Sequence, residues 1–329
     1  MSKIRTLYYF DKKSTQEMIS FLNNSANDNY INNIMFNPFI PLHHLLPLKL
    51  KFLPESYVLT RSKACKGLIT VAPAKGWKKR IEIQKLFFEE NCTEDAIELV
   101  QYVTSKYKAM GAFSIVVKVD DYFSELISLF ITKCGFSQIS NEKLWRITAF
   151  NNANFNKKNY RIFRNSDAKK IAEIYNNSLL PHFRTILSKG KNDFKESFFK
   201  GLSYYNEYKY VIENDKNIVG CIIIRTLDNE NYVIDIIQNN GYDIDINAAI
   251  SYATYQIKKR KKKFGLFVRT KGYTNTNSTY EETFISNGYN CIQNQLVLTN
   301  SSARILKDNV HSGKFTVLSE FCSSNPMPT

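Results

Sequence analysis

The chain has 329 residues, of which 43% are hydrophobic and 14% aromatic, and its formal net charge is +15. This composition excludes a disordered chain, and the length suits two domains of ordinary size. No run approaches the roughly 20 apolar residues that span a bilayer, so we expect no membrane span.

The first half reads as alternating strands and helices around one long insert. Strands are predicted at 4–10, 56–61, 66–73, 80–90, 112–119 and 142–150, and helices at 14–24, 93–110 and 122–136. The insert, residues 24–55, is apolar but broken by prolines. We expect it to pack between domains rather than to form one helix.

The second half begins after a polar, Asn-rich stretch, residues 151–159, which is predicted to be a linker. Strands are predicted at 160–163, 208–212, 218–227, 232–238, 264–269 and 291–299, and helices at 166–180, 193–202, 246–258 and 278–287. The order β-α-β-β-β-α-β-α-β thus occurs twice, which predicts a duplicated α/β unit, 1–150 and 160–299. Residues 300–329 are expected to form a tail with one strand at 314–321 and a disordered end.

Short motifs accompany this order of elements. A polar turn leads into a strand that begins Ile218-Val219-Gly220, and the last helix ends with Phe284, three residues, Gly288 and Tyr289. Gly135–Phe136 match that helix end in the first half. In order and motifs the chain resembles the GNAT superfamily of N-acyltransferases, over nearly its whole length.

The resemblance implies an α/β fold with a mixed, strongly curved sheet (α+β type) and two GNAT-like domains in tandem. It implies that each sheet splits between its fourth and fifth strands and that acyl-CoA lies in the split. The pantetheine arm would pair with the fourth strand, and the pyrophosphate would contact the loop that follows. The cosubstrate, acetyl-CoA or another acyl-CoA, is therefore expected at Ile236, Ile237, Asn239, Asn240, Gly241 and Tyr242.

The loops depart from the family pattern Q/R-x-x-G-x-G/A. The second-half loop reads QNNGYDIDIN, with one glycine and with Asp243 and Asp245 nearby. The first-half loop, FFEENCTEDAIEL, has no glycine and several carboxylates. At an effective dielectric constant near 20, a carboxylate about 6 Å from a phosphate costs roughly 3 kcal/mol. We interpret the first domain as non-catalytic and the second as a possible acyl-CoA site.

Acyl transfer to an amine needs a base and often an acid. Asp235 interrupts an apolar strand and is the candidate base, with the alternative that it faces a solvent-filled cleft or pairs with a lysine. In the first half Glu82 and Gln84 share one face of the predicted strand 80–90, and the same two interpretations apply to them. The resemblance implies a tyrosine in the last helix, where this chain has Phe284, so Tyr280, one turn earlier, is the candidate acid, with a core residue as the alternative.

A run of basic residues ends the predicted helix 246–258, where cations favour the helix dipole. It is also a candidate contact for an acidic protein or nucleic acid. Its members are Lys258, Lys259, Arg260, Lys261, Lys262 and Lys263.

The six cysteines lie far apart without a zinc-finger spacing and the histidines number four, so no metal is expected. The start of the chain has no apolar signal-peptide core, because Asp11, Lys12 and Lys13 interrupt it, so a cytoplasmic location is expected.

The predicted function is transfer of an acyl group from acetyl- or acyl-CoA to an unidentified amine acceptor, in the C-terminal domain. One alternative is a catalytically inactive pseudo-acyltransferase that binds a protein or serves as an assembly factor. Another is an RNA- or tRNA-linked protein, since Fem-type aminoacyltransferases share the duplicated architecture and use aminoacyl-tRNA.

Overall fold

The computed structural model describes residues 3–7, 55–61, 64–74, 77–88, 92–148, 155–196 and 206–301. The predicted helix 14–24, the tail strand 314–321 and nearly all of the insert 24–55 lie outside these residues.

The described strands form one mixed sheet of twelve strands, in the order β1-β2-β3-β4-β5-β12-β6-β11-β10-β9-β8-β7. Their bounds are β1 Lys3–Thr6, β2 Glu55–Arg61, β3 Ala64–Ala74, β4 Trp77–Phe88, β5 Ser114–Asp120, β6 Ser137–Arg146, β7 Tyr160–Ile162, β8 Asn206–Asn214, β9 Asn217–Thr226, β10 Asn231–Gln238, β11 Gly265–Lys271 and β12 Asn290–Ser301. The predicted mixed α/β sheet is confirmed.

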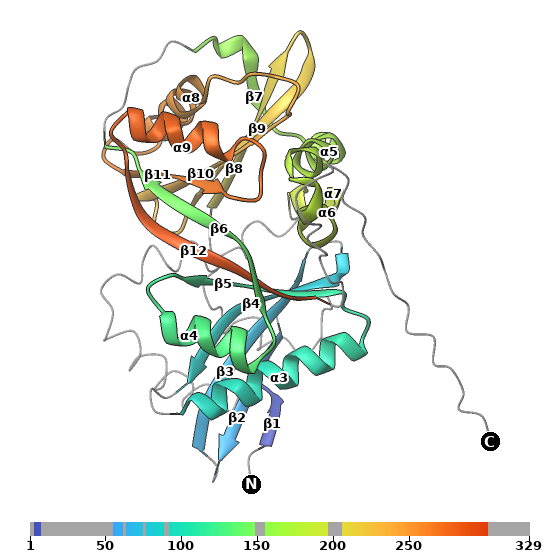
Figure 1. The fold of residues 1–329 in the computed structure, drawn as a ribbon. Coiled ribbons are helices and arrows are strands. Elements are labelled where there is room, and N and C mark those ends of the chain that lie inside the picture. The colour runs from blue at the N-terminus through green and yellow to red at the C-terminus, as the bar shows by residue number, and fades with distance from the viewer. Residues whose placement is uncertain are drawn as a thin grey trace, which may run out of the picture.

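The α-helices pack on both faces of this sheet (Figure 1). They are α3 Thr93–Ala109, α4 Ser124–Ser128, α5 Ala168–Ser178, α6 Pro181–Leu187, α7 Lys191–Phe194, α8 Ile246–Lys258 and α9 Asn277–Ser286. In the second half, α8 and α9 pack on the face that carries Ile222 and Ile224, and α5–α7 on the face that carries Cys221 and Ile223.

The two halves exchange their last strands. β6 leaves the first half and pairs with β11, while β12 leaves the second half and pairs with β5. β6 and β12 also pair with each other, so they run through the centre of the sheet and join its two halves (Figure 1). Side chains from β5 and β12 thereby reach the core under α5 and α6, which contains Val116 and Val297. The domain boundaries stay a prediction.

Some predicted elements differ in detail. The polar turn before Ile218 joins β8 and β9 as a hairpin, with Asp215 and Lys216 in the left-handed region at φ of 48° and 65°, which suits a tight two-residue turn. The predicted helix 122–136 is shorter, because α4 passes into a π-helical turn at Leu129–Lys133. α6 begins separately from α5 because Pro181 cannot continue the preceding helix.

Both halves contain the predicted split between parallel strands. β4 pairs with β5 only over Arg80–Ile83, although β4 continues to Phe88. β10 pairs with β11 only over Asn231–Asp235, although β10 continues to Gln238. Beyond these positions the strands of each pair separate.

Candidate functional site

Charged side chains meet where β10 and β11 separate. Asp235 and Arg269 form the last paired position of these strands. Their side chains lie on the α5–α7 face, because the neighbouring Ile234 and Val268 point into the core under α8. The most polar positions of the second half therefore lie at the start of its split.

Asp235 is 2% exposed and contacts three cationic side chains. Its Oδ1 accepts a hydrogen bond from Arg269 Nε at 2.9 Å and pairs with Lys271 Nζ at 3.0 Å. Its Oδ2 accepts from Arg225 Nη1 at 2.7 Å and also from Arg269 Nη2. Burial alone would raise the pKa of Asp235, but the three cations hold it well below its usual range. The carboxylate is thus a weak proton acceptor, and the lysine pairing considered as an alternative is present.

Glu142, on β6, is a second fully buried carboxylate. Its Oε1 lies 2.9 Å from Lys118 Nζ and accepts a hydrogen bond from Tyr273 Oη, and its Oε2 lies 3.5 Å from Arg269 Nη1. Burial alone would raise its pKa, but Lys118, Arg269 and Lys271 lower it to about 2. Arg269 thus links the two buried carboxylates.

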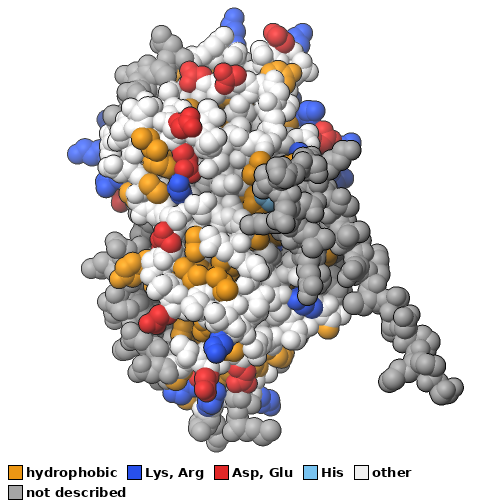
Figure 2. All heavy atoms as spheres, in the orientation of Figure 1, with side chains coloured by type: hydrophobic (Ala, Val, Ile, Leu, Met, Phe, Trp, Pro, Cys, Tyr) orange, Lys and Arg blue, Asp and Glu red, His pale blue; other side chains and the backbone are white. Residues whose placement is uncertain are grey.

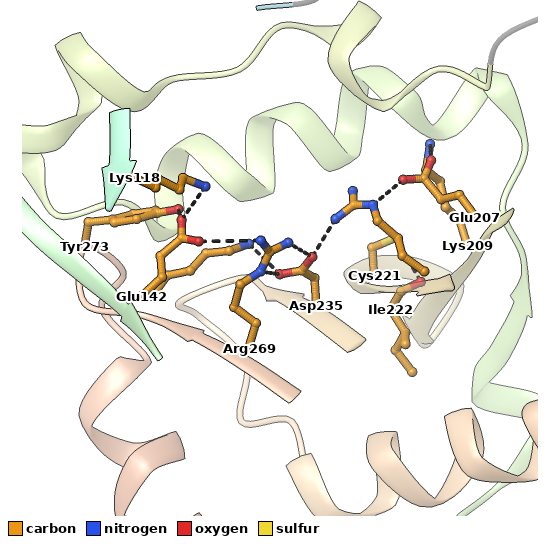
Figure 3. A network of polar contacts seen from close by, with 11 residues as sticks. Lys118, Glu142, Glu207, Lys209, Cys221, Ile222, Asp235, Arg269 and Tyr273 are labelled. Carbon is orange, nitrogen blue, oxygen red and sulfur yellow. Dashed lines mark hydrogen bonds and ion pairs between the residues drawn. The ribbon is translucent and has the colours of Figure 1, made fainter. Parts of the chain in front are cut away.

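The network continues towards the edge of the sheet (Figure 3). Arg225, on β9, donates through Nε to Glu207 Oε2 at 2.7 Å, and Glu207 Oε1 lies 2.8 Å from Lys209 Nζ. Side chains of opposite charge therefore alternate from Glu207 through Arg225, Asp235 and Arg269 towards Glu142. Because the exchanged strand β6 supplies Glu142, the strand exchange is part of how this site is built.

A cavity opens beside this network, between the sheet and α5–α7. About 60 Å³ of it is open to water-sized molecules, which is room for about four to six waters. Carboxylates in its lining are Glu142, Asp193 and Asp235. Six cationic side chains line it: Lys118, Lys189, Lys209, Arg225, Arg269 and Lys271. The cavity is therefore strongly polar and has an excess of positive charge.

Lys189 belongs to the segment between α6 and α7. Its Nζ lies 4.8 Å from the ring centroid of Tyr175, and within the described residues no carboxylate forms an ion pair with it. Burial lowers the pKa of Lys189 to about 7, and the nearby charges of Lys271 and Arg80 add to this effect. This lysine is the cation of the cavity that is least compensated by the protein.

The sequence did not single out the cations of this network. The available signal was the one that identified Asp235, a charged residue within an apolar strand: Lys118, Arg225 and Arg269 each follow runs of Val, Ile or Phe. Their convergence depends on the order of the strands, which the sequence pattern does not contain.

The turn expected to hold the pyrophosphate uses several of its backbone groups internally. Asn239 N donates to Val219 O at 2.9 Å, and Tyr242 N donates to Asn239 O at 3.0 Å. Gly241 N lies 3.5 Å from Asn239 Oδ1, and the side chain of Asn240 donates to Asn177 O at 2.7 Å. Two of these amides are therefore already satisfied by the protein.

The N-terminus of α8 is occupied by the protein's own carboxylate. Asp245 is the N-cap, and its Oδ1 accepts from Asn247 N at 2.9 Å and from Ala248 N at 3.1 Å. A phosphate would seek the same N–H groups and the same end of the helix dipole. Among the residues expected at the donor, Ile237 is buried and lines the cavity, and Ile236 packs against the core under α8.

Tyr280 connects α9 to the unpaired end of β10. Its side chain is 7% exposed and its Oη donates to Gln238 Oε1, while Gln238 Nε2 donates to Tyr242 O at 2.5 Å. Burial raises the pKa of Tyr280, so its hydroxyl stays protonated. The structure brings Tyr280 close to the predicted loop and places it in the core beside Phe284. Within the described part of the chain, no hydrogen bond joins Tyr280 to Asp235.

The basic run follows α8, as expected. Lys259 Nζ lies 4.2 Å from the ring centroid of Tyr255, and Lys261 pairs with Glu230 at 3.2 Å. On the face shown in Figure 2, basic side chains are interspersed with acidic ones.

No group of metal-ligating side chains and no helix long and apolar enough to span a membrane occurs among the residues that the structure describes.

No protein-family model matches the sequence, and no curated protein matches it. Solved structures do match. A tandem GNAT protein from the clavulanic acid biosynthesis pathway has a TM-score of 0.60 and 8% identity, over 92% of this chain and 98% of that one. A GCN5-related N-acetyltransferase from Sphaerobacter thermophilus has a TM-score of 0.59 and 10% identity, over 91% and 95%. A probable N-acyltransferase from Enterococcus faecalis has a TM-score of 0.52 and 8% identity, over 92% and 72%. The chain therefore has a tandem GNAT fold, as predicted.

Proposed function

We propose that the chain is a GNAT-like N-acyltransferase whose second half transfers an acyl group from a thioester donor to an amine. The proposal rests on one coincidence: the ladder between β10 and β11 ends at Asp235 and Arg269, and both residues line the charged cavity. A donor in the split and an acceptor in the cavity would meet at this point, which is the proximity that acyl transfer requires.

The donor would lie along the end of β10, at Ile236 and Ile237, where the strand has no ladder to β11. The nucleotide end of acyl-CoA would gain little from the turn Asn239–Tyr242 or from the helix that Asp245 already caps. We therefore expect the donor to be held by its acyl-pantetheine arm. Pantetheine-linked donors other than CoA would then be used about as well.

Two side chains have roles in this proposal. Tyr280 would donate a proton to the leaving thiolate, because its buried phenol is neutral and lies beside the unpaired end of β10. The proton that the amine nitrogen loses as the C–N bond forms and the C–S bond breaks would pass to water in the cavity. Asp235 would position Arg269 and Lys271 rather than accept a proton, because these cations stabilise its charged form.

The test is release of free thiol from acetyl-CoA and from acetyl-pantetheine in the presence of a panel of primary amines. We expect amine-dependent release with specificity constants for the two donors within about threefold, and a lower kcat in Tyr280→Phe. Gln84→Leu, in the split of the first half, is the matched control and should retain the wild-type rate. Absence of amine-dependent release with every donor would refute the proposal.

A second function, ligand binding without catalysis, is favoured by one observation. Asp245 occupies the anion site of α8 with its own carboxylate. If this second function is correct, the protein should bind an amine or an anion in the cavity and should release no thiol from any donor.

A further inference from the structure

We propose that the charged cavity of the second half is a binding site for a compact dianion, phosphate or a phosphate monoester. The network of Figure 3 contributes five cationic side chains against three carboxylates, an excess of two positive charges before Lys189 is counted. A phosphate monoester carries a charge of about −1.5 to −2 near neutral pH. The charge of this ligand would thus balance that of the network.

The carboxylates of the network have cationic partners, although Glu142 Oε2 has an ion pair and no hydrogen bond, whereas two lysines of the cavity keep unused donors. Asp235 has contacts on both oxygens from three cations. Lys118 has one ion pair, and Lys189 has none within the described residues. An ammonium group has three N–H donors, so these two lysines have capacity for a ligand oxygen.

The shape of the site favours a tetrahedral oxyanion. The lysines reach the cavity from β5, β8, β11 and the α6–α7 segment, so their ammonium groups approach from several directions. Phosphate accepts hydrogen bonds around a tetrahedron, whereas a carboxylate accepts in one plane. The space of about 60 Å³ that is open to water-sized molecules suits a compact anion.

Protonation of Lys189 should control the affinity. The charged groups that face it are Arg80 on β4, Lys118 on β5, Arg225 on β9 and Lys271 on β11, and the rings of Tyr175 and Phe194 lie beside it. Asp193 lines the same cavity. Burial and these cations lower the pKa of Lys189 to about 7. A bound anion stabilises the charged form, so affinity should fall as pH rises above 7.

The first experiment is isothermal titration of the full chain with inorganic phosphate and with sulfate at constant ionic strength, with chloride and acetate as controls. We expect one saturable site for each dianion and none for chloride or acetate. Lys189→Met should weaken sulfate binding roughly 10- to 100-fold. Lys191→Met, an exposed lysine two residues away, should bind like the wild type. Equal binding of sulfate by the Lys189→Met variant and the wild type, or no saturable dianion site, would overturn the proposal.

The second measurement is the pH dependence of sulfate affinity, since sulfate keeps its charge between pH 6 and 8.5. We expect a fall of roughly tenfold or more over this range in the wild type. The fall should be absent in Lys189→Met. A flat profile in the wild type would overturn the assignment of Lys189 to the site.

If the second half transfers acyl groups, we expect the acceptor to be one molecule that carries both a primary amine and the phosphate group bound in the cavity. This extension rests on the proposed function. Thiol release should then be faster with phosphoethanolamine than with ethanolamine. Dianion binding without thiol release would refute acyl transfer and leave the anion site intact. Thiol release without dianion binding would refute the anion site and leave acyl transfer intact.

Discussion

The two splits of the sheet share a backbone arrangement and differ in chemistry on one face. Towards the helices α3 and α8 both are apolar: Ile83, the last paired residue of β4, lies in the core of the first half, and Ile234, the residue before the last pair of β10, lies in the core of the second. The next residue of β4 is Gln84, at a bulge just beyond the paired stretch, and the next residue of β10 is Asp235, on the opposite face of the sheet from Ile234.

The difference between the two splits indicates whether the charged network of the second half serves the fold or a ligand. A buried ion network is a weak source of stability, because desolvation offsets most of the attraction between charges. In the first half the split is followed by a partly exposed amide, Gln84, and the described residues next to it in β4 form no ion network of this kind. The charged cluster of the second half is therefore not required by the fold, which supports a ligand as the reason for it.

The largest effect is expected from Asp235→Leu. This change leaves Arg225, Arg269 and Lys271 close together without their shared carboxylate, so the free energy of unfolding should fall by about 3–5 kcal/mol. Gln84→Leu, at the corresponding place in the first half, should change it by less than about 1 kcal/mol. Urea unfolding of both variants checks this. If Asp235→Leu and Gln84→Leu lowered the free energy of unfolding by similar amounts, the two splits would not differ in the way proposed.

Acid should weaken the second half through Glu142. Its pKa is about 2 in the folded chain and 4.5 ordinarily, so the unfolded state binds more protons between these values. The stability that Glu142 contributes, about 3 kcal/mol, is complete above pH 4.5 and is lost as pH falls towards 2.

The measurement is the free energy of unfolding from pH 5 to pH 2.5 in wild type and in Glu142→Gln. The variant should be less stable at pH 5 and less sensitive to acid. Parallel pH profiles of the two proteins would show that Glu142 does not carry the acid sensitivity.

The N-cap residues of α8 and α3, which follow the two predicted donor loops, provide a further comparison of the two halves. Asp245→Ala should destabilise the chain by about 1 kcal/mol, because Asn247 N and Ala248 N lose their acceptor. Cys92→Ala, at the N-cap of α3, should cost less than Asp245→Ala, because the Cys92 side chain forms no cap hydrogen bond that could be lost. Thermal unfolding distinguishes the two. If Asp245→Ala also gained affinity for acetyl-CoA, the native carboxylate would be shown to block the donor's phosphates.

The sequence predicted the succession of strands and helices and the duplication, because hydrophobic periodicity and turn residues are local signals. Both splits were implied by the resemblance to the GNAT superfamily. It did not predict the strand exchange, in which β5 pairs with β12 and β11 pairs with β6, because no local signal determines which last strand each of them takes as a neighbour. The charged cluster was missed for the same reason. Asp235 stood out within its own strand, but Glu142 and Lys118 meet it only through the exchanged order of strands.

The last expected effect has the opposite sign. In the absence of ligand, Lys189→Met should stabilise the chain at pH 7 and below, because it removes a charge that other cations and burial disfavour. The folded pKa of about 7 lies below the ordinary 10.5, so between these values the unfolded state binds more protons and wild-type stability rises with pH. The advantage of the variant should therefore narrow from pH 7 towards pH 10, which unfolding curves at several pH values will show. Lys191→Met should produce no such trend. A variant that is more stable than the wild type yet no longer binds sulfate would show that Lys189 lowers stability and is needed for ligand binding. This result would support the conclusion that the charges beside the second split serve a ligand rather than the fold.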